Sequence, residues 1–183
     1  MIHRHSRRPG RKKPVLSQHI EFVDEENRPL GVLPENEVHR QGLLHRSVQV
    51  LVFDKAHRLL IRKRQGNRNL YPGRWDLSAS GHVLAGESAA DAACRKLEQE
   101  LGITPAGLRL VMALKGTPVT SFEFVYLFNA GKILTFPSSS QVQMEDTAYL
   151  DRDDMSSLAA EYPDILTPGL VYLWRKQLLF PRL

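Results

Sequence analysis

The chain has 183 residues, a length that fits one globular domain, and 42% of them are hydrophobic, which is enough for an ordinary core. No apolar run approaches the roughly 18 residues that a membrane span needs, which excludes a transmembrane protein, and the polar N-terminus lacks the apolar segment of a secretory signal. A single cysteine, Cys94, excludes an intrachain disulfide, so we expect a cytoplasmic protein.

The net charge of +5 is concentrated at the N-terminus, where six basic residues lie among the first thirteen. The other 19 basic residues face 20 acidic ones, so the body of the chain has a net charge of −1. We therefore expect residues 1–17 to form a basic, flexible tail and residues 18–183 to form the domain. No aromatic residue interleaves the basic charges as a stacking surface would require, which argues against a nucleic-acid partner.

The first half of the domain alternates short apolar runs with turns. This pattern predicts strands at His19–Asp24, Leu30–Leu33, Val48–Phe53 and Leu59–Arg64. A proline followed by acidic residues, Pro34–Glu37, predicts the start of a short helix that carries His39. The Gly- and Asn-rich stretch Gln65–Arg74 predicts a loop.

The second half contains the clearest helix, Glu87–Leu101, whose apolar residues recur at helical spacing and which Gly102 ends. Cys94 is expected to face the core among the alanines of this helix. Further strands are predicted at Leu77–His82, Leu108–Leu114, Ser121–Phe128 and Thr147–Leu150, with a closing helix at Pro168–Leu178. Strands interleaved with a few helices predict an α/β (α+β) fold, a mixed β-sheet sandwiched between helices.

Residues 81–103 carry the strongest chemical signal. A glycine-bounded loop enters a helix whose polar face carries Arg95, Gln99 and Glu100. Carboxylates three or four residues apart on one helix face can converge on a hard divalent cation, the ion that diphosphate chemistry needs. An acidic residue late in a helix opposes the helix dipole, a cost that a bound metal would offset.

This segment resembles the Nudix box, G-x5-E-x7-R-E-U-x-E-E-x-G-U, in which U is a bulky aliphatic residue. Seven positions match without insertion: Gly81, Glu87, Arg95, Leu97, Glu100, Gly102 and Ile103. The resemblance implies a Nudix fold, a Mg²⁺ or Mn²⁺ cofactor and a small-molecule diphosphate substrate, with Glu87 and Glu100 as catalytic residues. Lys96 and Gln99 stand where the family has glutamates, so the usual cluster of helix carboxylates cannot assemble.

The run from His39 to Gly102 is also similar to Nudix proteins related to type 1 isopentenyl diphosphate isomerase. The likeness implies a metal site that draws its ligands from His39, His45, His82, Glu100 and Glu123, with Glu123 also catalytic. It further implies that basic residues grip the diphosphate, and the substrate-binding candidates are Arg64, Arg68, Arg95 and Lys96. A set this rich in nitrogen would favour Mn²⁺ or Zn²⁺ over Mg²⁺ in affinity.

Two departures weaken an isomerase activity. Ser80 stands at the position of the isomerase's catalytic cysteine, and Gly169 at that of an aromatic residue that shields a carbocation. The leading hypothesis is therefore a metal-dependent hydrolase of a diphosphate linkage, such as that of a nucleoside diphosphate derivative. An isomerase-like enzyme and a catalytically inactive diphosphate-binding module remain alternatives, the latter because of Lys96 and Gln99. A homodimer is left open.

Overall fold

The computed structural model describes residues 18–65, 71–133 and 146–181. The predicted tail, residues 1–17, and Arg68 lie outside the described residues. In chain order the elements are β1 (His19–Val23), β2 (Pro29–Pro34), α1 (Glu35–Gln41), β3 (His45–Phe53), β4 (Leu59–Lys63), β5 (Trp75–Asp76), β6 (Ala79–His82), α2 (Ala89–Leu101), β7 (Arg109–Leu114), η1 (Pro118–Thr120), β8 (Glu123–Lys132), β9 (Thr147–Leu150), α3 (Arg152–Glu161), η3 (Pro163–Ile165) and α4 (Pro168–Arg175).

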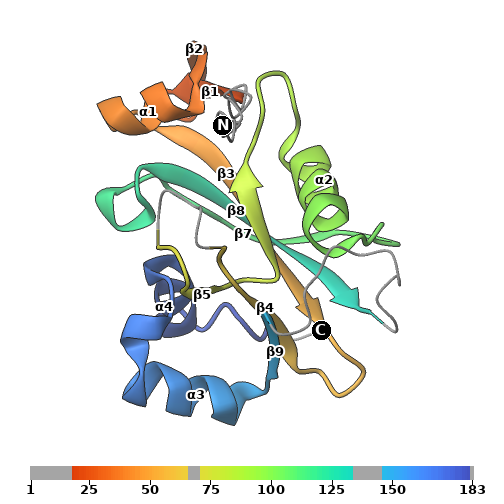
Figure 1. Ribbon diagram of the computed structural model, residues 1–183. Helices are drawn as coiled ribbons and strands as arrows, with labels where there is room; N and C mark the ends of the chain where they lie inside the picture. Colours follow the sequence, from red (N-terminus) through yellow and green to blue (C-terminus); the bar gives the residue numbers. More distant parts are fainter. Residues whose placement is uncertain (1–17, 66–70, 134–145, 182–183) are drawn as a thin grey trace, which may run out of the picture.

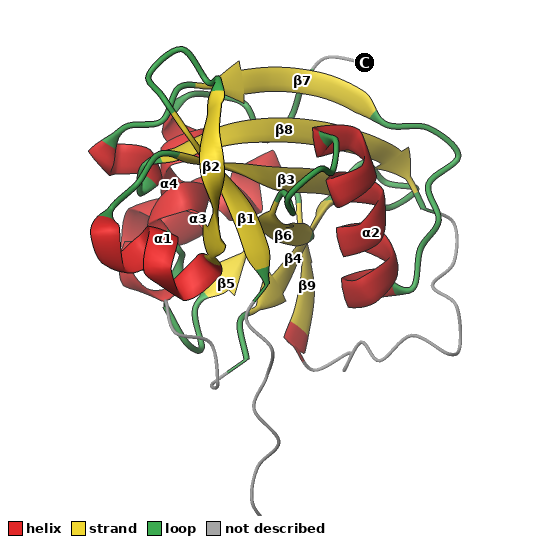
Figure 2. Ribbon diagram, turned by 90° about the horizontal axis from the view of Figure 1, so that it is seen from above, coloured by secondary structure: helices red, strands yellow, loops and turns green. Residues whose placement is uncertain are grey.

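The long strand β3 organises a mixed sheet, which confirms the predicted fold class (Figure 1). It pairs antiparallel with β1, β4 and β6 and parallel with β8. Figure 2 shows β3 and β8 side by side across the middle of the sheet. The registers place His45 opposite Glu123 on β8, and Ser47 opposite His82 on β6. Residues far apart in the sequence therefore meet at one end of β3.

The two faces of the sheet bury different helices, as the alternation of side chains along a strand requires. On one face, Val48, Val50 and Val52 of β3 pack with the buried residues of α2. On the other face, Leu51 and Phe53 pack with residues of α3 and α4. The sheet is thus sandwiched between α2 on one side and α3 and α4 on the other, as Figure 1 shows.

Helix α2 begins and ends where side chains satisfy its backbone. Ser88 caps its N-terminus by accepting a hydrogen bond from the Asp91 amide, and Gly102 ends it with a left-handed φ of 64°. The buried arc of α2 contains Ala92, Ala93, Lys96, Leu97 and Leu101. Cys94 lies outside this arc and is exposed, so the prediction that it faces the core was wrong.

Of the segment predicted as one strand, Leu77–His82, only Ala79–His82 forms a strand, β6, and the first two residues lie between β5 and β6. Ser78 is the second of these two and is fully buried. Its hydroxyl accepts a hydrogen bond from the Val52 amide of β3 at 3.0 Å and donates one to the Leu60 carbonyl of β4 at 2.5 Å. Ser78 therefore joins β3 and β4 where the two strands diverge, and β6 continues along β3 alone.

Candidate functional site

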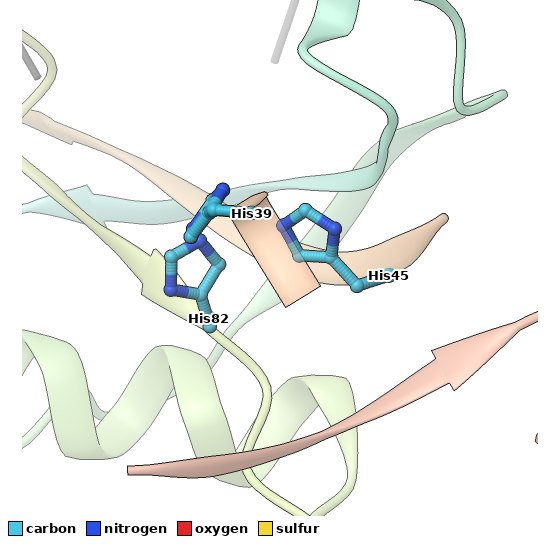
Figure 3. Close-up of side chains that lie close together, drawn as sticks. All are labelled: His39, His45 and His82. Carbon is cyan, nitrogen blue, oxygen red and sulfur yellow. The ribbon is translucent and has the colours of Figure 1, made fainter. Parts of the chain in front are cut away.

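Three histidines from separate elements converge at the N-terminal end of β3 (Figure 3). His39 comes from α1, His45 is the first residue of β3, and His82 is the last residue of β6. One ring nitrogen of each lies within 4.8 Å of the corresponding nitrogens of the other two. Their ring centroids are 4.8–5.1 Å apart. These residues are called the histidine cluster below.

Two carboxylates border the histidine cluster. Glu123, at the start of β8, has its Oε1 3.7 Å from His82 Nε2 and 3.9 Å from His45 Nε2. Glu35, at the start of α1, has its Oε1 3.4 Å from His82 Nδ1. Glu35 was not foreseen, although it lies four residues before His39 and hence one helical turn away.

His45 has a fixed tautomer and a buried lone pair. Its Nδ1 lies 2.8 Å from the Leu43 carbonyl, which can only accept a hydrogen bond, so Nδ1 carries the proton. Its Nε2 is left as an acceptor that is buried and has no hydrogen-bond partner among the described residues. Burial lowers the pKa of His45 to about 4, and the nearby His82 adds to the effect. His45 is therefore neutral at pH 7, the form that binds metals.

The other two histidines have opposite electrostatic surroundings. Burial lowers the pKa of His39, so this imidazole is also neutral at pH 7. Burial disfavours the charged form of His82 as well, but the carboxylates of Glu123 and Glu35 outweigh burial and raise its pKa to about 9. Burial raises the pKa of Glu123, yet the charge of His82 outweighs burial and keeps that pKa below its usual value.

These features fit a divalent metal ion. A buried imidazole nitrogen without a partner is costly unless something binds it, and here it faces a second neutral imidazole and an ionised carboxylate. The hydrogen bond from Nδ1 to a backbone carbonyl is the usual way in which proteins orient a metal-binding histidine. A cation at the cluster would replace the proton that His82 holds in its absence.

Glu100, predicted to share this site, has other partners. Its Oε1 is 2.6 Å from Lys96 Nζ, and its Oε2 is 3.2 Å from Arg62 of β4. The Ser80 amide of β6 also points to Oε2, at 3.4 Å. Among the described residues, the group whose side chains lie close enough together to hold a metal ion consists of the three histidines and does not include Glu100. Glu100 is thus the centre of a second cluster, called the α2 cluster below: Arg62, Lys96 and Glu100.

Arg62 was not singled out from the sequence. Strand alternation places it on the same face of β4 as Leu60, whose side chain is buried against α2. A basic residue at an inward position of a strand was the signal that could have found it.

Glu87 and Arg95 fasten the turn between β6 and α2. Arg95 pairs with both oxygens of Glu87, at 2.7 and 2.8 Å, and donates to the His82 carbonyl at 3.0 Å. The second oxygen of Glu87 also accepts the Leu84 amide at 2.9 Å. These contacts position the backbone of His82. The catalytic role predicted for Glu87 and the substrate role predicted for Arg95 remain predictions.

Arg64 lies at the junction of β4, β5 and α4. Its NH1 is 2.7 Å from Asp76 Oδ2, and Asp76 Oδ1 accepts a hydrogen bond from the Thr167 hydroxyl at 3.0 Å. A contact of Arg64 with substrate remains a prediction, as does that of Arg68, which lies outside the described residues.

A sequence model of the NUDIX domain matches residues 43–164. An uncharacterized Nudix hydrolase of Pseudomonas aeruginosa is 49% identical over 90 residues, which are 49% of this chain and 53% of that protein. The match thus spans about half of that relative's length. The isopentenyl-diphosphate Delta-isomerase of Nocardia farcinica is 42% identical over 158 residues, 82% of this chain and 89% of that enzyme.

Solved structures agree on the fold. A crystal structure of a Deinococcus radiodurans protein superimposes with a TM-score of 0.71 at 19% sequence identity, covering 87% of this chain and 98% of that one. In the part of the chain that the structure describes, no helix combines the length and the hydropathy needed to span a membrane.

Proposed function

The chain belongs to the Nudix family, and from that premise we propose that it hydrolyses the diphosphate linkage of a small molecule with a divalent ion held by the histidine cluster and Glu123. The observation that carries the proposal is the Nε2 of His45, which is buried beside Glu123 and has no hydrogen-bond partner among the described residues. When bound, the ion supplies Lewis acidity toward a phosphoryl oxygen and lowers the pKa of a bound water.

Other charged groups of the protein suit such a substrate. The α2 cluster has two cations for one carboxylate, so it retains a net positive charge that complements phosphate oxygens. Glu123 is ionised, and its oxygen can complete the ligand set or orient the attacking water. Arg64 and Arg68, which follow β4 in the sequence, are the further phosphate-binding groups of this proposal.

Hydrolysis is favoured over isomerisation by the residues near Gln49 of β3. Ser80 is the partner of Gln49 across β3 and β6, and a Cβ at Gly169 of α4 would lie 3.4 Å from Gln49 Nε2. Isomerase chemistry would need a strong proton donor and an aromatic shield for a carbocation. A serine and a glycine supply neither, and the chain's one thiol, Cys94, is exposed on α2.

The second candidate is an isomerase-like enzyme, because the Nocardia isomerase aligns with 82% of this chain at 42% identity. Replacement of the box glutamates by Lys96 and Gln99 also leaves an inactive diphosphate-binding module as a third candidate. The hydrolase would release phosphate or pyrophosphate, the isomerase would move a double bond, and the binding module would bind a diphosphate without turnover.

A substrate panel separates them. Phosphate or pyrophosphate release is measured from nucleoside diphosphate derivatives and other diphosphates with Mn²⁺, with Mg²⁺ and with chelator. We expect Mn²⁺-dependent release that His45→Ala removes and that His19→Ala, at an exposed histidine of β1, preserves. Deuterium incorporation into isopentenyl diphosphate without hydrolysis would establish the isomerase instead. Binding of diphosphates without turnover of any would establish the binding module.

A further inference from the structure

The α2 cluster occupies the place where the Nudix box brings glutamates together, yet two of its three charged side chains are cationic. Lys96 is buried and forms an ion pair at 2.6 Å with Glu100, one helical turn away. Arg62 approaches the same carboxylate from β4 on its other oxygen. Both oxygens of Glu100 thus already contact a positive charge that the protein itself supplies.

The path of Lys96 is built into the fold. A Cβ at position 81 would lie 2.7 Å from both Cδ and Cε of Lys96, closer than carbon atoms can approach. The absence of a side chain at Gly81 is therefore what lets the lysine stem lie against β6 on its way to Glu100. The Lys96 and Glu100 side chains are only 11% and 14% exposed, so water screens this pair little.

The α2 cluster is a poor binding site for a metal ion. Mg²⁺ and Mn²⁺ seek several oxygen ligands, and an ammonium or a guanidinium offers none. An ion beside Glu100 would also have to lie close to Lys96 Nζ and Arg62 NH1, where like charges repel strongly because burial reduces screening. The neighbouring box position holds Gln99, which is exposed and whose amide carries no negative charge.

We propose that the ammonium of Lys96 takes the place of the metal ion at the Nudix helix, so that this chain binds a single divalent ion, at the histidine cluster. The inference rests on the proposed function for the location of that one ion. The part that concerns α2 stands separately, because it follows from the contacts of Glu100 alone. Arg62 completes the replacement by neutralising the second oxygen of the carboxylate.

Metal stoichiometry in the absence of substrate tests the proposal. Free Mn²⁺ is measured by electron paramagnetic resonance during titration of the full chain and of four variants. We expect one Mn²⁺ for the wild type and also for Gln99→Glu, which adds a box carboxylate but keeps Lys96. Lys96→Glu restores the other box carboxylate and should bind two. His82→Ala should bind none, and the His82→Ala/Lys96→Glu double variant one.

The outcomes separate the two proposals. If His82→Ala binds Mn²⁺ as the wild type does, the histidine site fails, whereas a second ion gained by Lys96→Glu would still support the replacement at α2. If the wild type binds two ions, or if Gln99→Glu alone gains an ion, Lys96 does not exclude metal and the inference is overturned. Failure of Lys96→Glu to gain an ion while folded, as judged by circular dichroism, overturns it as well.

Glu100→Gln provides a measurement that does not depend on a drastic substitution, since the two side chains have nearly the same size. Because Glu100 holds no metal in this account, the Mn²⁺ dissociation constant should change by less than about twofold. A variant that removes a ligand or its direct support changes metal affinity by about 10–100-fold. A loss of that size in Glu100→Gln would make Glu100 a ligand and contradict the inference.

Discussion

On one face of β6 the His82 side chain joins two further imidazoles and Glu123, whereas near the other face Lys96 crosses Gly81 to reach Glu100. The first cluster leaves a buried acceptor, His45 Nε2, without a hydrogen-bond partner in the part of the chain that the structure describes. The second provides both oxygens of its one carboxylate with cations. An unmet acceptor indicates that a ligand is missing, and a neutralised carboxylate indicates that the protein has replaced the ligand.

The largest effect on turnover is expected at Glu123, the carboxylate that borders the histidine cluster on β8. Glu123→Gln keeps the size of the side chain but removes the charge that faces His82 and His45. We expect about a 100-fold loss of metal-stimulated turnover, at the upper end of the effects seen when a group that supports a metal site is changed.

Glu35→Gln is the comparison for this prediction. Glu35 approaches His82 from the Nδ1 side, and its side chain is 37% exposed, against 18% for that of Glu123. Its loss should therefore cost clearly less turnover than that of Glu123. Equal losses in the two variants would mean that Glu123 has no special place beside the metal.

The next prediction concerns the passage of Lys96 over β6. Gly81→Ala places a methyl group against the lysine stem and should destabilise the protein by about 1–3 kcal/mol, the usual cost of overpacking. Lys96→Ala in the same chain should restore much of this loss, because the clash disappears. Urea denaturation of the single and double variants measures both effects.

Gly107→Ala is the control, since nothing lies within 4 Å of a Cβ at that position. It should leave the free energy of unfolding almost unchanged. A double variant as unstable as the sum of its two single variants would show that Gly81 and Lys96 do not interact.

The free energy of unfolding of the metal-free protein should depend on pH, with a smaller effect whose sign can be predicted. His82 has a folded pKa of about 9, above the ordinary 6.5, so its stabilisation is complete below pH 6.5 and is lost as the pH rises toward 9. His45 has a folded pKa of about 4, so the unfolded chain takes up the proton first and stability falls as the pH drops from 6.5 to 4.

The metal-free protein should therefore be most stable near pH 6.5, with a decline on the order of 1–3 kcal/mol on either side. Chemical denaturation in the presence of a chelator, from pH 4.5 to pH 9, measures this profile. His82→Ala should flatten the alkaline limb. Stability that increases steadily up to pH 9 would show that His82 carries no proton in the folded protein.

Much of this organisation could be predicted from the sequence where local spacing determines it. Apolar residues at helical spacing predicted the helix now seen as α2, Gly102 predicted its end, and alternation predicted β1 to β4. The acidic turn at Asp151–Asp154 that caps α3 was overlooked, and with it the helix Arg152–Glu161. Its weak apolar periodicity left the cap as the only strong signal.

What depends on strand register was less accessible. The histidines were predicted as a group from a resemblance, but their distances follow from the pairing of β3 with β6 and β8. The inward position of Arg62 on β4 was visible in the sequence, but its pairing with Glu100 depends on how β4 diverges from β3 at Ser78. Cys94 was placed on the wrong side of α2 because it lies just beyond the edge of the buried arc.

The central claim is that the histidine cluster holds the metal ion, and metal-linked stability tests it most directly. The free energy of unfolding is measured with and without Mn²⁺ at pH 6 and pH 8, in the wild type and in His45→Ala. At an ion concentration 100 times the dissociation constant, binding to the folded state stabilises it by about 2.7 kcal/mol. We predict this gain in the wild type, larger at pH 8 because His82 must release its proton, and none in His45→Ala. An equal gain in both proteins would contradict the account.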